Sequence, residues 1–259
     1  MKSQIPNDAT AFLLKFVKPE YENDFIQGKL RMNPLSYFIE REKETGDRGV
    51  GDALEASAVY ADVEMTLMDP ETDEVLVKGK AERINIHSND RIKSPVLCMY
   101  SVDKDVLQVS SEDESSIEVF PQIEKNELEK LISDFGDNML IINAKLFMDR
   151  VKEKCEELQI DFKAGKVKYY DFSKNYSDRV SKYLDLDSSD ICFIKDDYFK
   201  AQNEYRLLLE NVSTESYHIL DIGDISDLVT KFKISDFFSG RYKIILKKEM
   251  IEVGTEGFK

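Results

Sequence analysis

Glycine and proline are scarce in this chain, at 11 and 6 of 259 residues, which argues against long flexible linkers. No stretch approaches the roughly 18 apolar residues that a membrane-spanning helix needs. The first residues, MKSQIPNDATAF, lack the apolar centre of a secretory signal peptide. We therefore expect a cytoplasmic protein that does not contact a membrane.

Cysteine and histidine are also few. Cys98, Cys155 and Cys192 lie far apart among apolar residues, which is typical of buried free thiols. The absence of a CxxC pair or a Cys/His cluster argues against a structural zinc site, and we expect a fold that needs no metal. His87 and His218 alternate with apolar neighbours, so we expect packing roles for both and no serine or cysteine nucleophile system.

Basic residues are outnumbered, with 36 Lys and Arg against 51 Asp and Glu, and the formal net charge is −15. Binding to a phosphate backbone needs a basic field, so we expect no direct nucleic-acid binding. The acidity has two interpretations. It favours solubility, or it lets the protein occupy another protein's basic groove in place of DNA.

The rest of the composition predicts a globular fold, because 42% hydrophobic residues are interleaved with 34% charged ones. We expect one α+β domain over 1–259, with a mixed or mostly antiparallel sheet and packed helices. Period-two alternation predicts a β-hairpin insertion at 58–90. The other expected strands are 11–17, 95–102, 139–143, 167–172, 191–195, 204–210, 217–223 and 242–248. The expected helices are 19–27, 35–44, 121–135, 144–160 and 177–184.

The segment DRGVGDALEA is a glycine-rich loop with three acids and one arginine. No lysine follows the glycines, so the loop does not match a phosphate-binding P-loop. Two alternatives remain for its carboxylates. They hold a divalent cation, although the spacing fits no EF-hand, or Asp52 caps a short helix with Glu55 at its third position, which we favour. The candidate residues in this loop are Asp47, Arg48, Asp52 and Glu55.

The segment KAQNEYRLLLE predicts a strand in which every second residue from Tyr205 to Leu209 faces the core. Gln202, Glu204 and Arg206 share the opposite face, and we expect Glu204 and Arg206 to line a groove or meet solvent. One interpretation is a half-solvated strand whose charges pair with neighbouring strands. The other is a carboxylate at the mouth of an active-site cleft.

The Gln-x-Glu pattern at the start of this strand resembles the acidic motif of ADP-ribosyltransferases. The resemblance implies an ADP-ribosyltransferase-like fold with NAD as cofactor, in which Glu204 stabilises the transition state and Gln202 orients the acceptor. The family also uses a His or Arg on its first strand and a Ser or Tyr on a middle one. The first strand here offers only a lysine, and CMYS stands at the middle strand. The matching positions are Ser101 as a further catalytic residue and Lys15, Arg31 and Tyr100 as cofactor-binding residues.

A larger part of the chain resembles a family of bacterial and prophage proteins without an assigned activity. The segments that carry this resemblance are GKLRMNPLSYF, GDALEA, LCMYS, FIKDDYFKAQNEYRLLL and HILDIGDISDL. The frequent setting of that family in phage or defence neighbourhoods implies a role in phage–host conflict.

Two classes of function therefore remain open. The chain is an acidic interaction protein of phage–host conflict, in defence or counter-defence, that binds and modulates a protein partner. Alternatively, it is an ADP-ribosyltransferase-like enzyme or an NAD-binding or other nucleotide-binding protein that uses Glu204. The sequence leaves the oligomeric state open.

Overall fold

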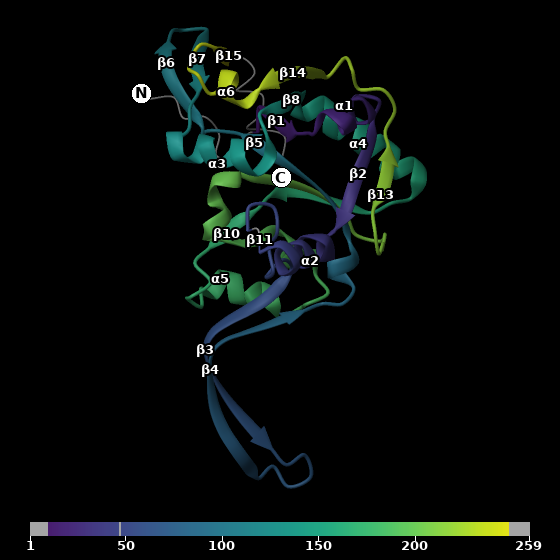
Figure 1. The fold of residues 1–259 in the computed structure, drawn as a ribbon, viewed down its shortest axis with the longest axis vertical. Coiled ribbons are helices and arrows are strands. Elements are labelled where there is room, and N and C mark those ends of the chain that lie inside the picture. The colour runs from purple at the N-terminus through teal and green to yellow at the C-terminus, as the bar shows by residue number, and fades with distance from the viewer. Residues whose placement is uncertain (1–9, 47, 249–259) are drawn as a thin grey trace. The chain divides into compact units, whose positions relative to one another are not determined.

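The computed structural model describes residues 10–46 and 48–248. The predicted α+β class is confirmed, since helices accompany sheets whose strand pairs are mostly antiparallel. The chain forms two compact units and passes between them several times (Figure 1). Of the described residues, unit 1 contains 10–31, 98–159 and 219–248, and unit 2 contains 32–97 apart from 47, together with 160–218.

Unit 1 is built on an antiparallel sheet. Strand β1 (Phe12–Phe16) lies between β8 (Asn138–Asn143) and the end of β5 (Pro95–Val102), and β8 also pairs with β14 (Val229–Lys233). A second sheet, in the order β15 (Ile244–Lys247), β7 (Ser116–Pro121) and β6 (Leu107–Glu112), carries part of the same core. The remaining elements are α1 (Pro19–Ile26), α3 (Lys125–Phe135), α4 (Ala144–Leu158), β13 (His218–Asp221) and α6 (Ile234–Phe237).

The ends of the unit 1 helices follow the local sequence. Asn143 caps α4, because its side-chain oxygen accepts a hydrogen bond from the backbone N–H of Leu146 at 3.1 Å, next to the start of the helix predicted at 144–160. After α1, Gly28 has a φ of +80°. A Cβ there would lie 1.8 Å from the backbone oxygen of Gly223, so only glycine allows this close approach.

Unit 2 combines antiparallel and parallel strand pairs with short helices. Strands β9 (Phe162–Lys166) and β12 (Glu204–Leu209) are antiparallel, and β10 (Lys168–Tyr170) and β11 (Ile194–Asp196) are parallel. Strand β2 (Lys29–Pro34) pairs with the start of β5. The other elements are α2 (Leu35–Thr45), β3 (Ser57–Met68), β4 (Val75–His87), η1 (Arg91–Lys93), α5 (Ser177–Val180), η2 (Ser181–Tyr183), η3 (Ser189–Phe193) and η4 (Asp197–Gln202).

Strands β3 and β4 form the long antiparallel hairpin that the period-two pattern predicted at 58–90. Its first residues are anchored in unit 2. Asn175 both accepts from the backbone N–H of Ala61 at 3.0 Å and donates to its C=O at 2.7 Å. Arg179 is fully buried and donates to the C=O of Val59 at 2.7 Å. Beyond Ala61, the hairpin contains no buried residue as far as the end of β4 at His87.

Candidate functional site

The start of β12 is held in place by backbone geometry and by one tyrosine. Asn203 has a φ of +36° and turns the chain from η4 into the strand. The backbone N–H of Glu204 then donates to the hydroxyl of Tyr169 at 2.8 Å, and its C=O accepts from the N–H of Val167 at 2.9 Å. These contacts fix the direction in which the Glu204 side chain leaves the strand.

Arg206 is the centre of a buried ionic network. Only 1% of it is exposed. Its two terminal nitrogens donate to the two carboxylate oxygens of Glu55 at 2.6 and 2.8 Å, and its Nε donates to Glu204 Oε1 at 2.6 Å. The backbone C=O of Cys192 accepts a further bond. The guanidinium is thus surrounded by acceptors in a bidentate arrangement that suits arginine better than lysine.

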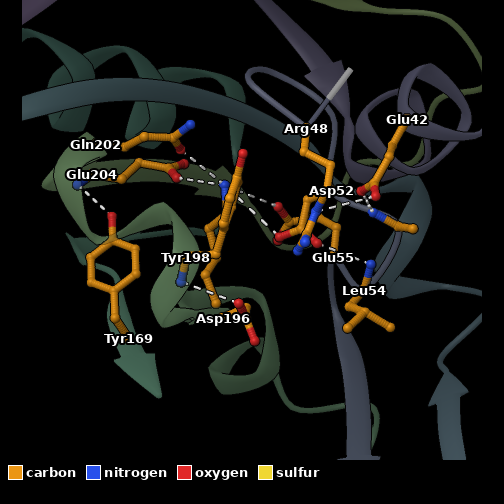
Figure 2. A network of polar contacts seen from close by, with 12 residues as sticks. Glu42, Arg48, Asp52, Leu54, Glu55, Tyr169, Asp196, Tyr198, Gln202 and Glu204 are labelled. Atoms are coloured by element: carbon orange, nitrogen blue, oxygen red, sulfur yellow. Dashed lines mark hydrogen bonds and ion pairs between the residues drawn. The ribbon is translucent and has the colours of Figure 1, made fainter. Parts of the chain in front are cut away.

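Lys195, on β11, is the second buried cation. Its Nζ lies 3.2 Å from Gln202 Oε1 and 3.3 Å from Glu204 Oε2, with Glu55 at 3.8 Å and Asp52 at 4.0 Å. Figure 2 shows Gln202 and Glu204 on one side of this network and Asp52 and Glu55 on the other. Burial alone would lower the pKa of Lys195, but the neighbouring carboxylates, Glu204 first, raise it above its ordinary value.

Asp52 carries the excess negative charge of this network, which we call the buried ionic cluster (Asp52, Glu55, Lys195, Gln202, Glu204, Arg206). Three carboxyl groups face two cations there. Burial, and then the charge of Glu55, raise the pKa of Asp52 to about 7. When Asp52 is protonated, the cluster is electrically neutral, as a site with so little solvent requires.

The loop before β3 closes over the cluster through contacts within unit 2. Gln202 donates from Nε2 to the C=O of Gly49 at 2.7 Å. Glu42 accepts from the backbone N–H of Ala53 at 2.6 Å and pairs with Arg48 at 3.4 Å. The Arg48 guanidinium in turn lies 4.3 Å from the ring centroid of Tyr198 (Figure 2). These contacts therefore hold the loop in place at Arg48, Gly49 and Ala53.

The capping interpretation of this loop was wrong for Glu55. Residues 53–56 form turns and not a helix. Asp52 does accept a backbone bond, from the N–H of Leu54 at 3.0 Å. The Glu55 carboxylate instead pairs with Arg206, because a buried guanidinium is a stronger partner than a backbone amide. Asp47, another candidate from this loop, lies outside the described residues.

The expectation that Glu204 and Arg206 face a groove or solvent was also wrong. Glu204 is 5% exposed and Arg206 1%, whereas Tyr205 on the opposite face is half-buried. The alternate leucines from 207 to 209 are buried as predicted. The polar face is buried because Glu55 supplies its counter-charge from a distant loop, which period-two alternation cannot reveal.

The remaining candidates belong to unit 1. Lys15 donates to the C=O of Cys98 at 2.8 Å, and the Ser101 hydroxyl donates to Asp103 at 2.9 Å. Tyr100 packs in the apolar core, where burial raises the pKa of its hydroxyl well above the usual range. Arg31, also in unit 1, lies with its guanidinium 5.8 Å from the ring centroid of Tyr21.

The structure thus brings four candidates together, namely Gln202, Glu204, Asp52 and Glu55. The sequence interpretation had not singled out Lys195, although it follows the apolar run ICFI directly. A lone lysine at the end of such a run is a signal of a buried ion pair, since lysine is almost never buried without a partner. Within 10–46 and 48–248, no group of His, Cys, Asp or Glu is arranged to hold a metal ion.

A second feature of unit 2 is the hairpin beyond Ala61. The register pairs Val63 with Ala81, Met65 with Gly79 and Leu67 with Val77. Residues directly opposite in an antiparallel pair share a face. These six residues therefore form one apolar surface, which we call the apolar ribbon face (Val63, Met65, Leu67, Val77, Gly79, Ala81).

The opposite face of the same ribbon carries polar and charged pairs at 64–66 and 78–80. Glu64 is opposite Lys80 and bonded to it at 2.7 Å, and Thr66 is opposite Lys78. The apolar ribbon face is nonetheless open: Leu67 is 60% exposed and Val77 59%. The hairpin is thus amphipathic with its apolar side uncovered by any residue that the structure describes.

Comparisons with known proteins returned no match: no family model fits the chain, and neither the curated proteins nor the solved structures contain a significant relative. The two resemblances drawn from sequence, and the phage–host setting that one of them implies, stay predictions. None of the described helices combines the length and apolar character that crossing a bilayer requires.

Proposed function

We propose that this chain is a non-catalytic interaction protein that binds another protein through the apolar ribbon face of its β3–β4 hairpin. The observation that carries the proposal is the exposure of Met65, Leu67 and Val77 on one face of a two-stranded ribbon. Apolar residues clustered on one exposed surface favour an interaction site, whereas scattered ones do not.

The length of the ribbon supports the same function. An isolated two-stranded hairpin is marginally stable in water and gains stability when a third layer covers its apolar side. From Asp62, which has a φ of +49°, the strands continue for several residues past their anchored start. A segment that contributes so little to its own unit's core is best explained by a partner that covers it.

The buried ionic cluster supports a structural role for Glu204 rather than catalysis. Both oxygens of its carboxylate are engaged, one by Arg206 and the other by Arg206 and Lys195. An acid that stabilises a cationic transition state must be free to approach the substrate. The ADP-ribosyltransferase alternative therefore finds less support in this geometry than a binding function.

The charge of the chain favours a protein as the partner. At a net charge of −15, contact with a phosphate backbone would be repulsive. An acidic protein with an apolar docking face can instead occupy and modulate a basic protein, as the composition already suggested. If the phage–host setting holds, such modulation is the activity that defence or counter-defence would use.

The test is affinity capture from the cells that naturally produce the chain, with two matched double variants. Leu67→Glu with Val77→Glu alters the apolar ribbon face, and Thr66→Glu with Lys78→Glu alters the opposite face at the same depth. We expect the wild type and the polar-face variant to retain the same partner and the apolar-face variant to lose it. Retention by all three proteins would contradict the proposal.

A further inference from the structure

We infer, on the basis of the proposed function, that the protein partner presents an apolar groove whose rim carries lysine or arginine. The first observation is the turn that joins β3 to β4. Its sequence, DPETDE, contains four acids and no basic residue. The apolar ribbon face runs directly into this acidic turn, so both must meet the same partner.

The turn is an ordered structure. Asp69 accepts from the backbone N–H groups of Glu71 and Thr72, each at 2.9 Å, and its own N–H donates to the C=O of Glu74 at 2.9 Å. Asp73 has a φ of +57° and donates its N–H to the C=O of Asp69 at 3.0 Å. One acid thus closes the turn and leaves the other three carboxylates to project from it.

A second copy of the chain fits this surface poorly. The ribbon from 63 to 68 is about 20 Å long at about 3.3 Å per residue. Two such flat faces would bury a few hundred Å², well below the roughly 1,200 Å² of a stable complex. The two acidic turns would find few basic partners, with Arg83 at the far end of the face. A concave groove that covers the apolar ribbon face and both edges of the ribbon buries more.

A lipid bilayer also fits poorly. Segments that lie in a membrane interface combine apolar residues with lysine and arginine, because the headgroups of the cytoplasmic leaflet are anionic. Here the apolar residues end at a cluster of acids, which such headgroups repel. A basic rim around an apolar floor complements the ribbon in both properties.

The experiment uses the full chain and three synthetic 18-residue amphipathic helical peptides as probes. The peptides share one leucine face, and its flanks carry lysine, glutamine or glutamate. In fluorescence anisotropy at about 50 mM salt, we expect the lysine peptide to bind at least tenfold more tightly than the glutamine peptide. We expect no binding of the glutamate peptide, and a several-fold loss of lysine-peptide affinity at about 300 mM salt.

Two sets of variants separate the charge from the apolar contact. The combination Glu71→Gln, Asp73→Asn and Glu74→Gln keeps Asp69 and the closed turn, and should remove the preference for the lysine peptide. The control Glu64→Gln with Glu82→Gln removes two acids outside the turn and should leave the preference unchanged. If the turn variant and the wild type bind the lysine peptide with equal affinity, the inference that the partner's groove has a basic rim is wrong.

The remaining outcomes distinguish this inference from the proposed function. If the glutamine peptide binds as tightly as the lysine peptide and Leu67→Glu abolishes both, the docking face stands and the basic rim is wrong. If Leu67→Glu leaves all binding unchanged, the proposed function itself fails. Sedimentation equilibrium showing a wild-type dimer that Leu67→Glu dissociates, or binding to phosphatidylcholine–phosphatidylglycerol vesicles, would assign the face to a different occupant and overturn the inference.

Discussion

The guanidinium of Arg206 forms two hydrogen bonds with the carboxylate of Glu55, a residue 151 positions earlier in the chain. This pair connects the loop before β3 to the strand β12 inside unit 2. The same loop leads into the hairpin, so the buried ionic cluster supports the base of the ribbon that we propose as the docking site.

Glu55→Ala should destabilise the protein by about 3–5 kcal/mol, because it leaves the Arg206 charge buried without its main partner. The matched control is Glu215→Ala, which removes one partner of an exposed pair with Lys93 at 2.7 Å in the same unit. That pair should contribute less than about 1 kcal/mol. Urea unfolding followed by circular dichroism measures the free energy of unfolding of both variants. Equal losses in the two variants would contradict the prediction that the Glu55–Arg206 pair matters more than an exposed pair.

Asp52→Asn should change how stability depends on pH. Burial raises the pKa of Asp52 in the folded protein to about 7, whereas its ordinary value is 3.8. The stability from this group is therefore fully present below about pH 4 and is lost as the pH rises through 7. Between pH 4 and pH 8, the free energy of unfolding of the variant should therefore rise by about 2–4 kcal/mol relative to that of the wild type.

The control variant, Asp171→Asn, should show the opposite dependence of stability on pH. Hydrogen bonds from the side chain of Lys174 and then from Ser173 hold the pKa of the half-buried Asp171 well below its usual range. Its contribution to stability is fully present above about pH 4 and is lost as the pH falls below that value. Asp171→Asn should therefore lose stability relative to wild type as the pH rises toward about 4, and the difference should stay constant from there to pH 8. Unfolding curves for Asp52→Asn that stay parallel to wild type at every pH would refute the assignment of the raised pKa.

Leu207→Ala should cost about 2–5 kcal/mol, as expected for a side chain with no exposed surface in a packed core. Leu184 is 88% exposed in the same unit, so Leu184→Ala should change the free energy of unfolding by less than about 0.5 kcal/mol. Chemical unfolding of the two variants side by side measures the difference. A small effect at both positions would mean that β12 is not part of the core.

The wild-type protein should release no nicotinamide from NAD, because the Glu204 carboxylate is already paired with two cations. Glu204→Gln should instead reduce thermal stability, since the buried Arg206 and Lys195 would lose a counter-charge. Nicotinamide release is measured by chromatography and stability by calorimetry. Turnover in the wild type that disappears in a fully folded Glu204→Gln protein would restore the transferase alternative.

Much of the local structure could be predicted from the sequence, because it depends on neighbouring residues. The cap at Asn143, the end of α1 and the hairpin of β3 and β4 follow from side-chain chemistry and period-two alternation. The segment 191–195 shows the limit: it was expected to be a strand, but residues 191–193 belong to a 3₁₀ helix. Its apolar residues satisfy either structure, so pattern alone could not decide.

The candidate site depended on contacts between distant residues. The partners of Arg206 include one that is 151 residues away, and no periodicity reports such a pair. The polar residues at the start of β12 looked like the rim of a cleft for the same reason. The division into two compact units likewise depends on how several distant chain segments combine, whereas the sequence led us to expect one α+β domain over 1–259.

The most direct test of the docking claim is a photo-crosslinking scan in the cells that naturally produce the chain. A photoreactive amino acid is placed at each position from Val63 to Leu67 in turn. Because alternate residues point to opposite faces, we expect partner adducts at positions 63, 65 and 67 and none at 64 and 66. Adducts of equal yield at all five positions, or at none, would contradict the claim that the apolar ribbon face binds a partner.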